Sequence, residues 1–236
     1  MSSNLNFTVL KPIRFRANRK PFLLIISVLL YFLFAFPPLF AKAGEPIKLV
    51  FLGDSLTEGF GVDKEDAYPA LTEKFFKEKG LDVKVINAGI SGSTSAGGPA
   101  RVKWLLKGKP DLILLALGAN DGLRGLDTEN LKNNLDKTVK AALKSGARVI
   151  LAGMKMPLNY GEEYRKNFEE TFIRVAAENK IPLIPFLLEG VAARKEFNIA
   201  DGIHPNEEGH KILTRTVTAA LEKIIEEIIQ GKPGKS

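Results

Sequence analysis

The chain contains no cysteine, which excludes both a disulfide framework and a lipid anchor attached to cysteine. A fold without disulfides depends on its hydrophobic core. The chain can supply one, because 45% of its 236 residues are hydrophobic, a size and composition that fit one domain. Histidine is also scarce: His204 and His210 are the only two, so there are few candidates for a general base near neutral pH.

Acidic residues are absent from the first 43 positions, which hold six basic ones. Removing those six from the chain's 34 basic residues leaves 28 against 27 acidic residues, so most of the net charge of +7 belongs to this N-terminal segment. The remaining chain is nearly neutral and lacks the basic excess typical of nucleic-acid binding. We therefore expect no nucleic-acid partner.

The N-terminal segment has the pattern of a secretory signal peptide. A basic start precedes an apolar run at residues 22–36, and Ala41-Lys42-Ala43 provides a small-x-small cleavage site, with cleavage expected after Ala43. A retained inner-membrane anchor is the alternative, but fifteen helical residues rise only about 22 Å, short of a hydrocarbon core of roughly 30 Å. The prediction is a periplasmic or secreted domain at 44–230 with a disordered tail at 231–236, contacting membrane only through the N-terminal segment or a lipid substrate.

From residue 45 onward, short apolar runs alternate with amphipathic stretches. Parallel neighbouring strands need crossover helices, so this alternation predicts a three-layer α/β/α sandwich around a five-stranded parallel sheet, flavodoxin-like in type. Trp104 is expected to pack inward from its helix, whereas Arg101 and His210 are expected at the surface of theirs. The expected strands are 47–52, 83–87, 112–117, 148–152 and 183–184, and the expected helices are 67–79, 99–106, 128–145 and 162–179, with a last long helix capped by Asn206.

Polar or glycine-rich loops follow the first three expected strands. Ser55 stands in Gly53-Asp54-Ser55-Leu56, Gly92 in the second loop and Asn120 in the third. The carboxyl ends of parallel strands share one sheet edge, so these loops should be neighbours. Backbone N–H groups and an Asn amide beside a serine are what an oxyanion hole requires. Each loop alone is typical of an ordinary turn, but the three together favour Ser55 as a nucleophile. Asp54 is expected to hold the turn and not to take part in catalysis.

A serine nucleophile needs a base, and His204 is the better placed of the two histidines. It lies in the loop before the last helix, three residues after Asp201. Asp201 can hold one imidazole nitrogen while the other takes the serine proton, which gives the chain order Ser, Asp, His. A turn in which Asp201 bonds only local backbone is the alternative interpretation.

These four blocks together resemble the SGNH hydrolase superfamily, also called GDSL esterases. Ser55 matches its nucleophile, Gly92 and Asn120 its second and third blocks, and Asp201 with His204 its Asp-x-x-His block. The similarity is closer still to the multifunctional acyl-CoA thioesterase I branch, which is also active as esterase and lysophospholipase, and it spans about residues 47–229. The chain departs from that branch at two positions: Ala119 stands where the branch often has a second glycine, and Gly89 stands where it often has serine. The loop after the second strand therefore offers two candidate oxyanion glycines, of which Gly92 is favoured over Gly89.

The resemblance implies a two-step acyl transfer through an acyl-enzyme on Ser55. The N–H groups of Ser55 and Gly92 and the Asn120 amide would hold the oxyanion, and Leu123 and Met156 would line the acyl pocket. It also implies a monomer without metal or organic cofactor that acts on a small acyl ester or thioester. Two other functions stay open: a carbohydrate O-deacetylase of the same superfamily, and a non-catalytic binding module that retains the fold.

Overall fold

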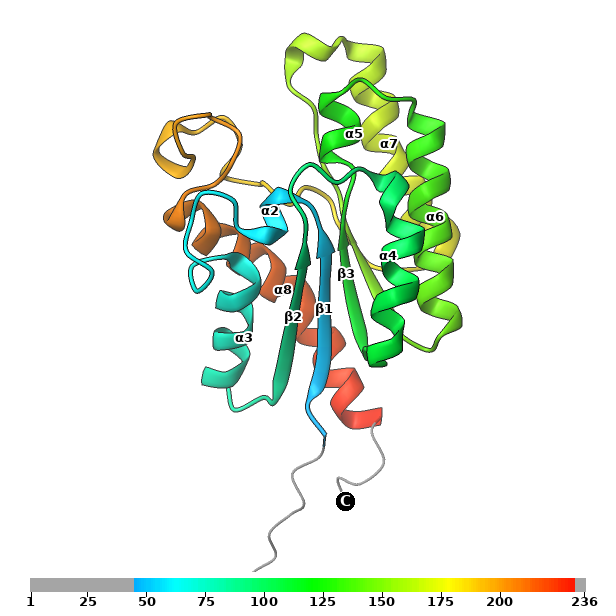
Figure 1. Ribbon diagram of the computed structural model, residues 1–236, viewed down its shortest axis with the longest axis vertical. Coiled ribbons are helices and arrows are strands. Elements are labelled where there is room, and N and C mark those ends of the chain that lie inside the picture. Colours follow the sequence, from blue (N-terminus) through cyan, green and yellow to red (C-terminus); the bar gives the residue numbers. More distant parts are fainter. Residues whose placement is uncertain (1–44, 232–236) are drawn as a thin grey trace, which may run out of the picture. The chain divides into compact units, whose positions relative to one another are not determined.

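The computed structural model describes residues 45–231 (Figure 1). The predicted signal peptide or anchor at 1–43 lies outside the described residues, as does the tail from 232 onward. The last helix reaches Gly231, one residue into the expected tail. None of the helices within 45–231 is long and apolar enough to cross a membrane.

All five strands run parallel in the order β2-β1-β3-β4-β5, which confirms the predicted flavodoxin-like sheet. Strand β1, which lies between β2 and β3, is buried from Leu49 to its end because helices cover both faces of the sheet. The strands are β1 (Ile47–Gly53), β2 (Val83–Gly89), β3 (Leu112–Ala116), β4 (Arg148–Ala152) and β5 (Leu183–Ile184).

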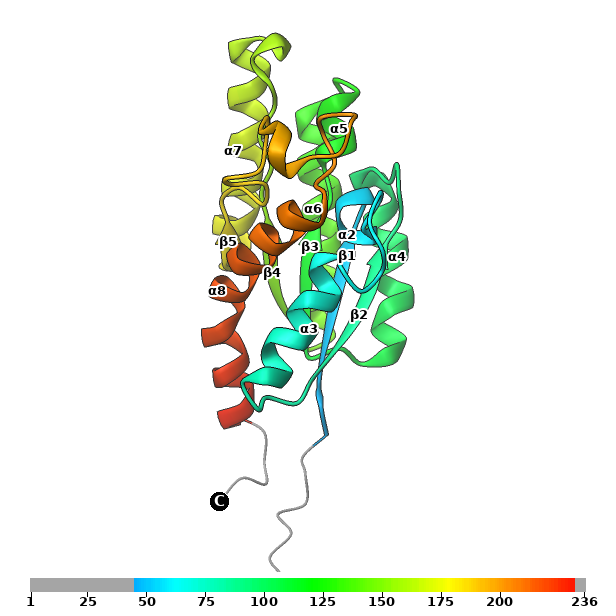
Figure 2. The ribbon, with the colours of Figure 1, turned by 90° about the vertical axis from the view of Figure 1, so that its left-hand side faces the viewer.

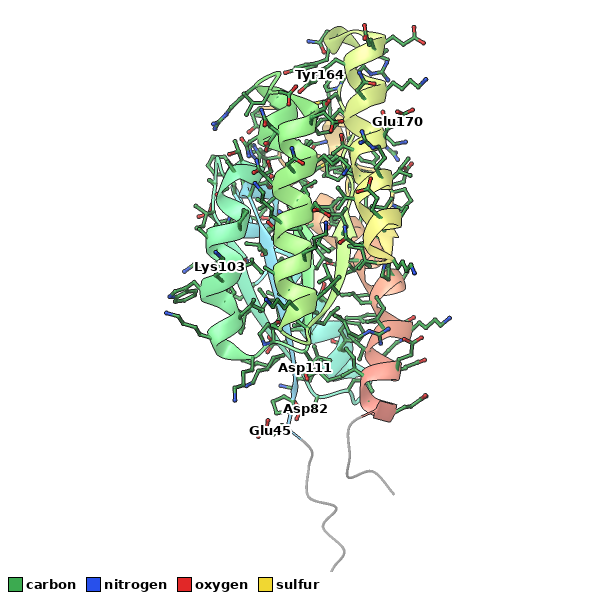
Figure 3. All side chains as sticks on the ribbon, turned by 90° about the vertical axis from the view of Figure 1, so that its right-hand side faces the viewer. Glu45, Asp82, Lys103, Asp111, Tyr164 and Glu170 are labelled. Carbon is green, nitrogen blue, oxygen red and sulfur yellow. The ribbon has the colours of Figure 1, made fainter. Side chains whose placement is uncertain are left out.

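Two helical layers sandwich the sheet. On one face α3 packs against α8, with α3 in front in Figure 2, and on the other face α4, α6 and α7 pack side by side in that order (Figure 3). The five are α3 (Tyr68–Glu78), α4 (Gly98–Leu105), α6 (Thr128–Lys144), α7 (Glu162–Asn179) and α8 (Glu207–Gly231). Single 3-10 turns occupy Ser95–Gly97, Leu106–Gly108, Leu158–Tyr160 and Lys195–Phe197.

Two further short helices stand where the sequence predicts only loops. These are α2 (Ser55–Glu58) and α5 (Ala119–Leu123), which follow β1 and β3 at the same end of the sheet (Figure 1). Both are too short to show a periodic apolar pattern, so sequence periodicity could not reveal them. Each carries a candidate site residue in its first turn, Ser55 in α2 and Asn120 in α5.

The cap of α8 is as predicted, because the Asn206 side chain accepts the N–H of Gly209 at 3.0 Å. The helix expected at 128–145 is capped by the residue before it, since the Asp127 side chain accepts the N–H of Asn130 at 2.7 Å.

Both predictions for the side chains of α4 are wrong. Trp104 is 68% exposed, whereas Arg101 is half-buried and donates from its guanidinium to the carbonyl of Ala88. The inward stripe of α4 contains Val102 and Leu105, which are buried three residues apart. Arg101 lies next to that stripe, while the bulk of Trp104 is turned away from it.

His210 is fully buried between α8 and α3, so the prediction of a surface residue is wrong. Its Nδ1 accepts the N–H of Tyr68 at 3.2 Å, and the two rings stack with centroids 6.1 Å apart. The Tyr68 hydroxyl bonds to Thr57 Oγ1 at 2.7 Å, which connects this pair to α2. His210 stands three residues before Leu213 and seven before Val217 on the apolar stripe of α8.

The buried imidazole of His210 should reduce stability in acid. Burial lowers the pKa of His210 to about 4, whereas an unfolded chain has a histidine pKa of about 6.5. The unfolded state therefore binds the proton first, and the contribution of His210, intact above pH 7, is lost as the pH falls through 6.5 toward 4. The loss reaches about 2 kcal/mol at pH 5. Urea unfolding of the wild type and of His210→Asn at pH 7.5 and pH 5 measures it.

The test compares the free energy of unfolding of the wild type with that of His210→Asn at each pH, because Asp54 changes stability with pH in the opposite direction. Burial raises the pKa of Asp54 to about 6, so this carboxyl makes the fold more stable as the pH falls below 6. Asp54 is present in both proteins and cancels in the difference. Asparagine at position 210 can accept the Tyr68 N–H without titrating. A stability difference that is the same at both pH values would contradict the prediction.

Candidate active site

Ser55 is the first residue of α2, directly beyond the carboxyl end of β1. The Asp54 side chain caps this helix by accepting the N–H of Leu56 at 3.1 Å, which agrees with the predicted role of Asp54 in the turn. The chain can fold back this tightly because Gly53 has no side chain: a Cβ there would stand 1.9 Å from Thr57 Oγ1. The sequence Gly-Asp-Ser therefore fixes a serine at the edge of the sheet.

Ser55, His204 and Asp201 form a continuous hydrogen-bonded chain. His204 Nε2 lies 2.9 Å from Ser55 Oγ, and its Nδ1 lies 2.6 Å from Asp201 Oδ2. The other Asp201 oxygen, Oδ1, accepts the N–H groups of Ile203 and His204 at 3.0 Å each. The structure thus brings together three predicted residues separated by up to 149 positions, in the arrangement that activates a serine hydroxyl.

Asp201 is held in its charged form. Burial alone would raise the pKa of this carboxyl, but hydrogen bonds from the Ile203 N–H, the His204 ring and the His204 N–H outweigh it and leave the pKa below its usual value. A carboxylate ionised throughout the neutral range can orient the imidazole and stabilise its protonated form.

The loop after β2 distinguishes between the two candidate glycines. Four of the five backbone N–H groups from Gly89 to Ser93 already donate to acceptors within the protein, and only the Gly92 N–H has none among the described residues. The Ser55 N–H, at the start of α2, is also without a protein acceptor in residues 45–231. In order along the loop, the four acceptors are Asn87 Oδ1 at 2.9 Å, Gly53 O at 3.3 Å, Glu58 Oε2 at 2.7 Å and Ile90 O at 3.2 Å.

Asn120 lies on α5 beside this loop. Its Nδ2 donates to the carbonyl of Ser93 at 3.1 Å, which occupies one of its two amide hydrogens and orients the other. The next residue, Asp121, is buried and accepts both the N–H and the hydroxyl of Ser95, at 2.8 and 2.6 Å. The loop and α5 are therefore joined at Ser93 and Ser95, which follow Gly92 in the loop.

Several side chains that hold the loop were missed by the sequence analysis. Asp121 binds Ser95, Arg124 donates to the Gly92 carbonyl at 3.0 Å, and Glu58 binds Ser91. These contacts join residues 26 to 33 positions apart, and no local pattern announces them. Asp121 and Arg124 do stand within one turn of Asn120, which is the one signal that could have marked them.

The two residues expected to line an acyl pocket differ in exposure. Leu123 is 39% exposed at the end of α5, while Met156, in the loop after β4, is 6% exposed. Met156 packs beneath α5, where a Cβ on Gly122 would meet its sulfur at 2.4 Å. Leu123 therefore faces solvent, and Met156 supports α5 from below.

Exposed apolar side chains occur at the edge of the sheet that holds Ser55. The Phe60 ring centroid lies 4.7 Å from that of His204, and the Phe60 N–H donates to the Ser55 carbonyl at 3.0 Å. Of the ten large apolar side chains that are exposed in residues 45–231, six stand in connections after strands, at the edge that holds Ser55. These six are Phe60, Ile90, Leu123, Leu126, Leu158 and Ile203. This edge can therefore offer apolar surface to a substrate.

Within the described part of the chain, no group of three or more His, Asp or Glu side chains is placed to hold a metal ion. The site instead contains the hydroxyl, imidazole and carboxylate described above, and the N–H groups of Ser55 and of Gly92 in the loop after β2 have no acceptor among residues 45–231. This combination can take a proton from a serine and can bind a developing negative charge on oxygen.

Residues 51–212 match the model of the GDSL-like lipase/acylhydrolase family. The chain is 40% identical to Esterase TesA of Pseudomonas aeruginosa over 75% of its own length and 89% of the relative's. It is 34% identical to thioesterase 1/protease 1/lysophospholipase L1 of Escherichia coli K12, over 78% and 88% of the two chains. The crystal structure of the psychrotrophic esterase EstA from Pseudoalteromonas, inhibited by monoethylphosphonate, aligns with a TM-score of 0.73 at 29% identity, covering 76% of this chain and 99% of that one.

The chain therefore belongs to the GDSL-like lipase/acylhydrolase family, also called SGNH hydrolases, and is an ester hydrolase of the GDSL type. This confirms the resemblance inferred from the four sequence blocks and makes a non-catalytic binding module the less favoured interpretation.

Proposed function

We propose that the protein hydrolyses acyl esters through a covalent acyl-enzyme on Ser55. The observation that carries this proposal is the continuous chain Ser55–His204–Asp201. The N–H groups of Ser55 and of Gly92, in the loop after β2, have no acceptor among residues 45–231. Ser55 Oγ attacks the substrate carbonyl while His204 Nε2 accepts its proton, and Asp201 stabilises the imidazolium that forms. The oxyanion is held by those two N–H groups and by the Asn120 amide.

Collapse of the tetrahedral intermediate breaks the bond to the leaving group, which takes the proton from His204. Water then attacks the acyl-enzyme as His204 accepts a proton from it, and the acid departs with Ser55 Oγ reprotonated. None of these steps requires a metal or an organic cofactor. The proposed catalytic residues are Ser55, His204 and Asp201, and the proposed monomer contains a complete set of them.

The proposed substrates are small molecules with an apolar acyl group, joined as an ester or a thioester. The exposed apolar side chains at the edge of the sheet that holds Ser55 support an apolar acyl group, with Leu123 the more accessible of the two expected pocket residues. The relative named thioesterase 1/protease 1/lysophospholipase L1 supports thioester and lysophospholipid cleavage. A carbohydrate O-deacetylase is less favoured because it needs a small, polar acyl site.

We further propose that the domain is exported and that its N-terminal segment is removed after about Ala43. The support is the basic start, apolar run and small-x-small site of residues 1–43. Edman sequencing of the exported protein tests this, since cleavage gives a new N-terminus near Gly44 and a retained anchor gives Met1.

A fluorophosphonate tests the hydrolase directly. The reagent should add to the wild-type protein once, on the peptide that contains Ser55, since only a serine activated by a base attacks phosphorus rapidly. Hydrolysis of p-nitrophenyl esters from acetate to dodecanoate, at equal concentrations, should favour octanoate or longer chains over acetate. An unlabelled wild-type protein would refute a serine hydrolase, and a preference for acetate would instead favour the deacetylase.

A further inference from the structure

The loop that carries Gly92 is held from the side of the nucleophile by one carboxylate. Glu58, the last residue of α2, accepts the N–H of Ser91 with its Oε2 at 2.7 Å, and the same oxygen accepts the Ser91 hydroxyl. Glu58 stands three residues after Ser55, and Ser91 stands one residue before Gly92. A single side chain thus connects the helix of the nucleophile to the residue next to the proposed oxyanion donor.

The backbone of Glu58 is itself fixed against the sheet. Asn87 in β2 donates from Nδ2 to the Thr57 carbonyl at 2.8 Å. Gly89 passes so close to α2 that a Cβ there would lie 2.1 Å from the backbone nitrogen of Glu58. These contacts hold α2 in place on β2, so the Glu58 carboxylate binds the loop from a fixed position.

The same hydrogen bond occupies the N–H group directly before that of Gly92. With the Ser91 N–H bound to Glu58, the Gly92 N–H is the one group from Gly89 to Ser93 that has no acceptor in the described residues. Gly92 has a φ of +74°, and a glycine, which has no side chain, is not held in that conformation by its own sterics. An oxyanion donor is effective only when it is oriented before the charge develops, so a flexible glycine needs a rigid neighbour.

We propose that Glu58 is a positioning residue for the oxyanion site, which fixes Ser91 and thereby holds the Gly92 N–H in place beside Ser55. This inference rests on the proposed function, because it takes Gly92 as an oxyanion donor. Glu58 does not touch the substrate. Its effect reaches the reaction through the loop.

The carboxylate has two effects that act in opposite directions. Its hydrogen bonds orient the loop, whereas its negative charge, near a developing oxyanion, opposes the reaction. Gln at position 58 keeps an acceptor for the Ser91 N–H and removes the charge, and Ala removes both. Since Glu58→Gln and Glu58→Ala lose the same charge, the difference between them reports the hydrogen bonds alone. Glu65→Ala, an exposed acid in the following loop, is the matched control for charge.

The experiment measures kcat and KM with p-nitrophenyl butyrate and the Kd of butylboronic acid, whose adduct with serine is tetrahedral and anionic. For Glu58→Ala we expect kcat to fall about 10- to 30-fold and KM to stay within twofold of the wild type. The expected loss of kcat is smaller than that for complete removal of one oxyanion donor, because the Gly92 N–H is misoriented and not removed. The Kd of the boronic acid should rise by the same factor as kcat falls. Glu58→Gln should stay within threefold of the wild type, and Glu65→Ala should equal it.

Two results would overturn the positioning role: Glu58→Ala behaving like Glu65→Ala, or Glu58→Gln losing as much kcat as Glu58→Ala. An unchanged boronic acid Kd together with a lowered Tm would also overturn it, since that result describes a purely structural residue. These outcomes are distinct from failure of the proposed function. In that case the wild type itself hydrolyses no ester and takes no fluorophosphonate, and the inference about Glu58 falls with it.

Discussion

Ser55→Ala is expected to lower kcat for ester hydrolysis by a factor on the order of 10⁴ to 10⁶ and to abolish fluorophosphonate labelling. The hydroxyl supplies the oxygen that attacks the carbonyl, and alanine leaves His204 without a proton to accept. The protein should remain folded, because Ser55 contributes no side-chain bond to the cap of α2, which Asp54 supplies. Steady-state rates, mass spectrometry of the labelled protein and a Tm measurement check the three parts.

His204→Ala should cost nearly as much, and the double variant Ser55→Ala/His204→Ala should be no slower than either single variant. Groups that act as one unit lose their function together, so their effects do not add. Ser145→Ala is the control, because Ser145 precedes β4 at the opposite edge of the sheet and bonds only the Ala142 carbonyl through its hydroxyl. Additive losses in the double variant, or more than about 1% residual activity in Ser55→Ala, would exclude this nucleophile.

The site could be predicted from sequence because the fold converts order along the chain into position in space. Once the apolar runs at β1, β2 and β3 identify a parallel sheet, the loops after them must share one edge. That rule brings the loops of Ser55, Gly92 and Asn120 together without any knowledge of side-chain contacts. His204 follows by elimination, since the chain has two histidines and only one lies in a loop. The choice of Gly92 and Asn120 within their loops came from the resemblance to SGNH hydrolases.

The failed predictions concern side chains whose environment depends on packing between elements. His210 and Arg101 are polar residues near the inward stripes of their helices, and the sequence analysis placed them at the surface because polar side chains usually lie there. Tyr68 provides the hydrogen bond that His210 needs, and the Ala88 carbonyl provides one for Arg101. Both partners come from other elements, at separations of 142 and 13 residues.

The contacts that hold the oxyanion loop are hidden for the same reason. Glu58 and Asp121 each accept one N–H and one hydroxyl of the loop, and Arg124 donates to a carbonyl. Most of these loop atoms belong to the backbone, which carries no sequence signal. An Asp or Glu near a motif is most often a solvated surface residue. Only the three-dimensional arrangement distinguishes such a residue from one that orients a catalytic donor.

Asn120→Ala should lower kcat by about 10² to 10³, equivalent to roughly 2.7 to 4 kcal/mol of transition-state stabilisation, with little change in KM. The amide hydrogen that does not bind Ser93 is available to the oxyanion, which carries a full charge only after attack on the carbonyl. Asn120→Asp has nearly the same shape but presents an oxygen acceptor where a donor is needed, so it should be at least as slow. Rates with p-nitrophenyl butyrate above and below KM separate the two parameters.

Asn134→Ala is the matched control for Asn120→Ala. Asn134 on α6 donates to the hydroxyl of Ser95 at 3.1 Å, so its loss also removes an amide bond to the same loop, at the end away from Gly92. If loop support explained the effect of Asn120, both variants would lose similar activity and similar Tm. If Asn120 holds the oxyanion, only Asn120→Ala loses kcat, and it also loses affinity for a boronic acid by the same factor. A raised KM with unchanged kcat in Asn120→Ala would assign the amide to ground-state binding and not to the oxyanion.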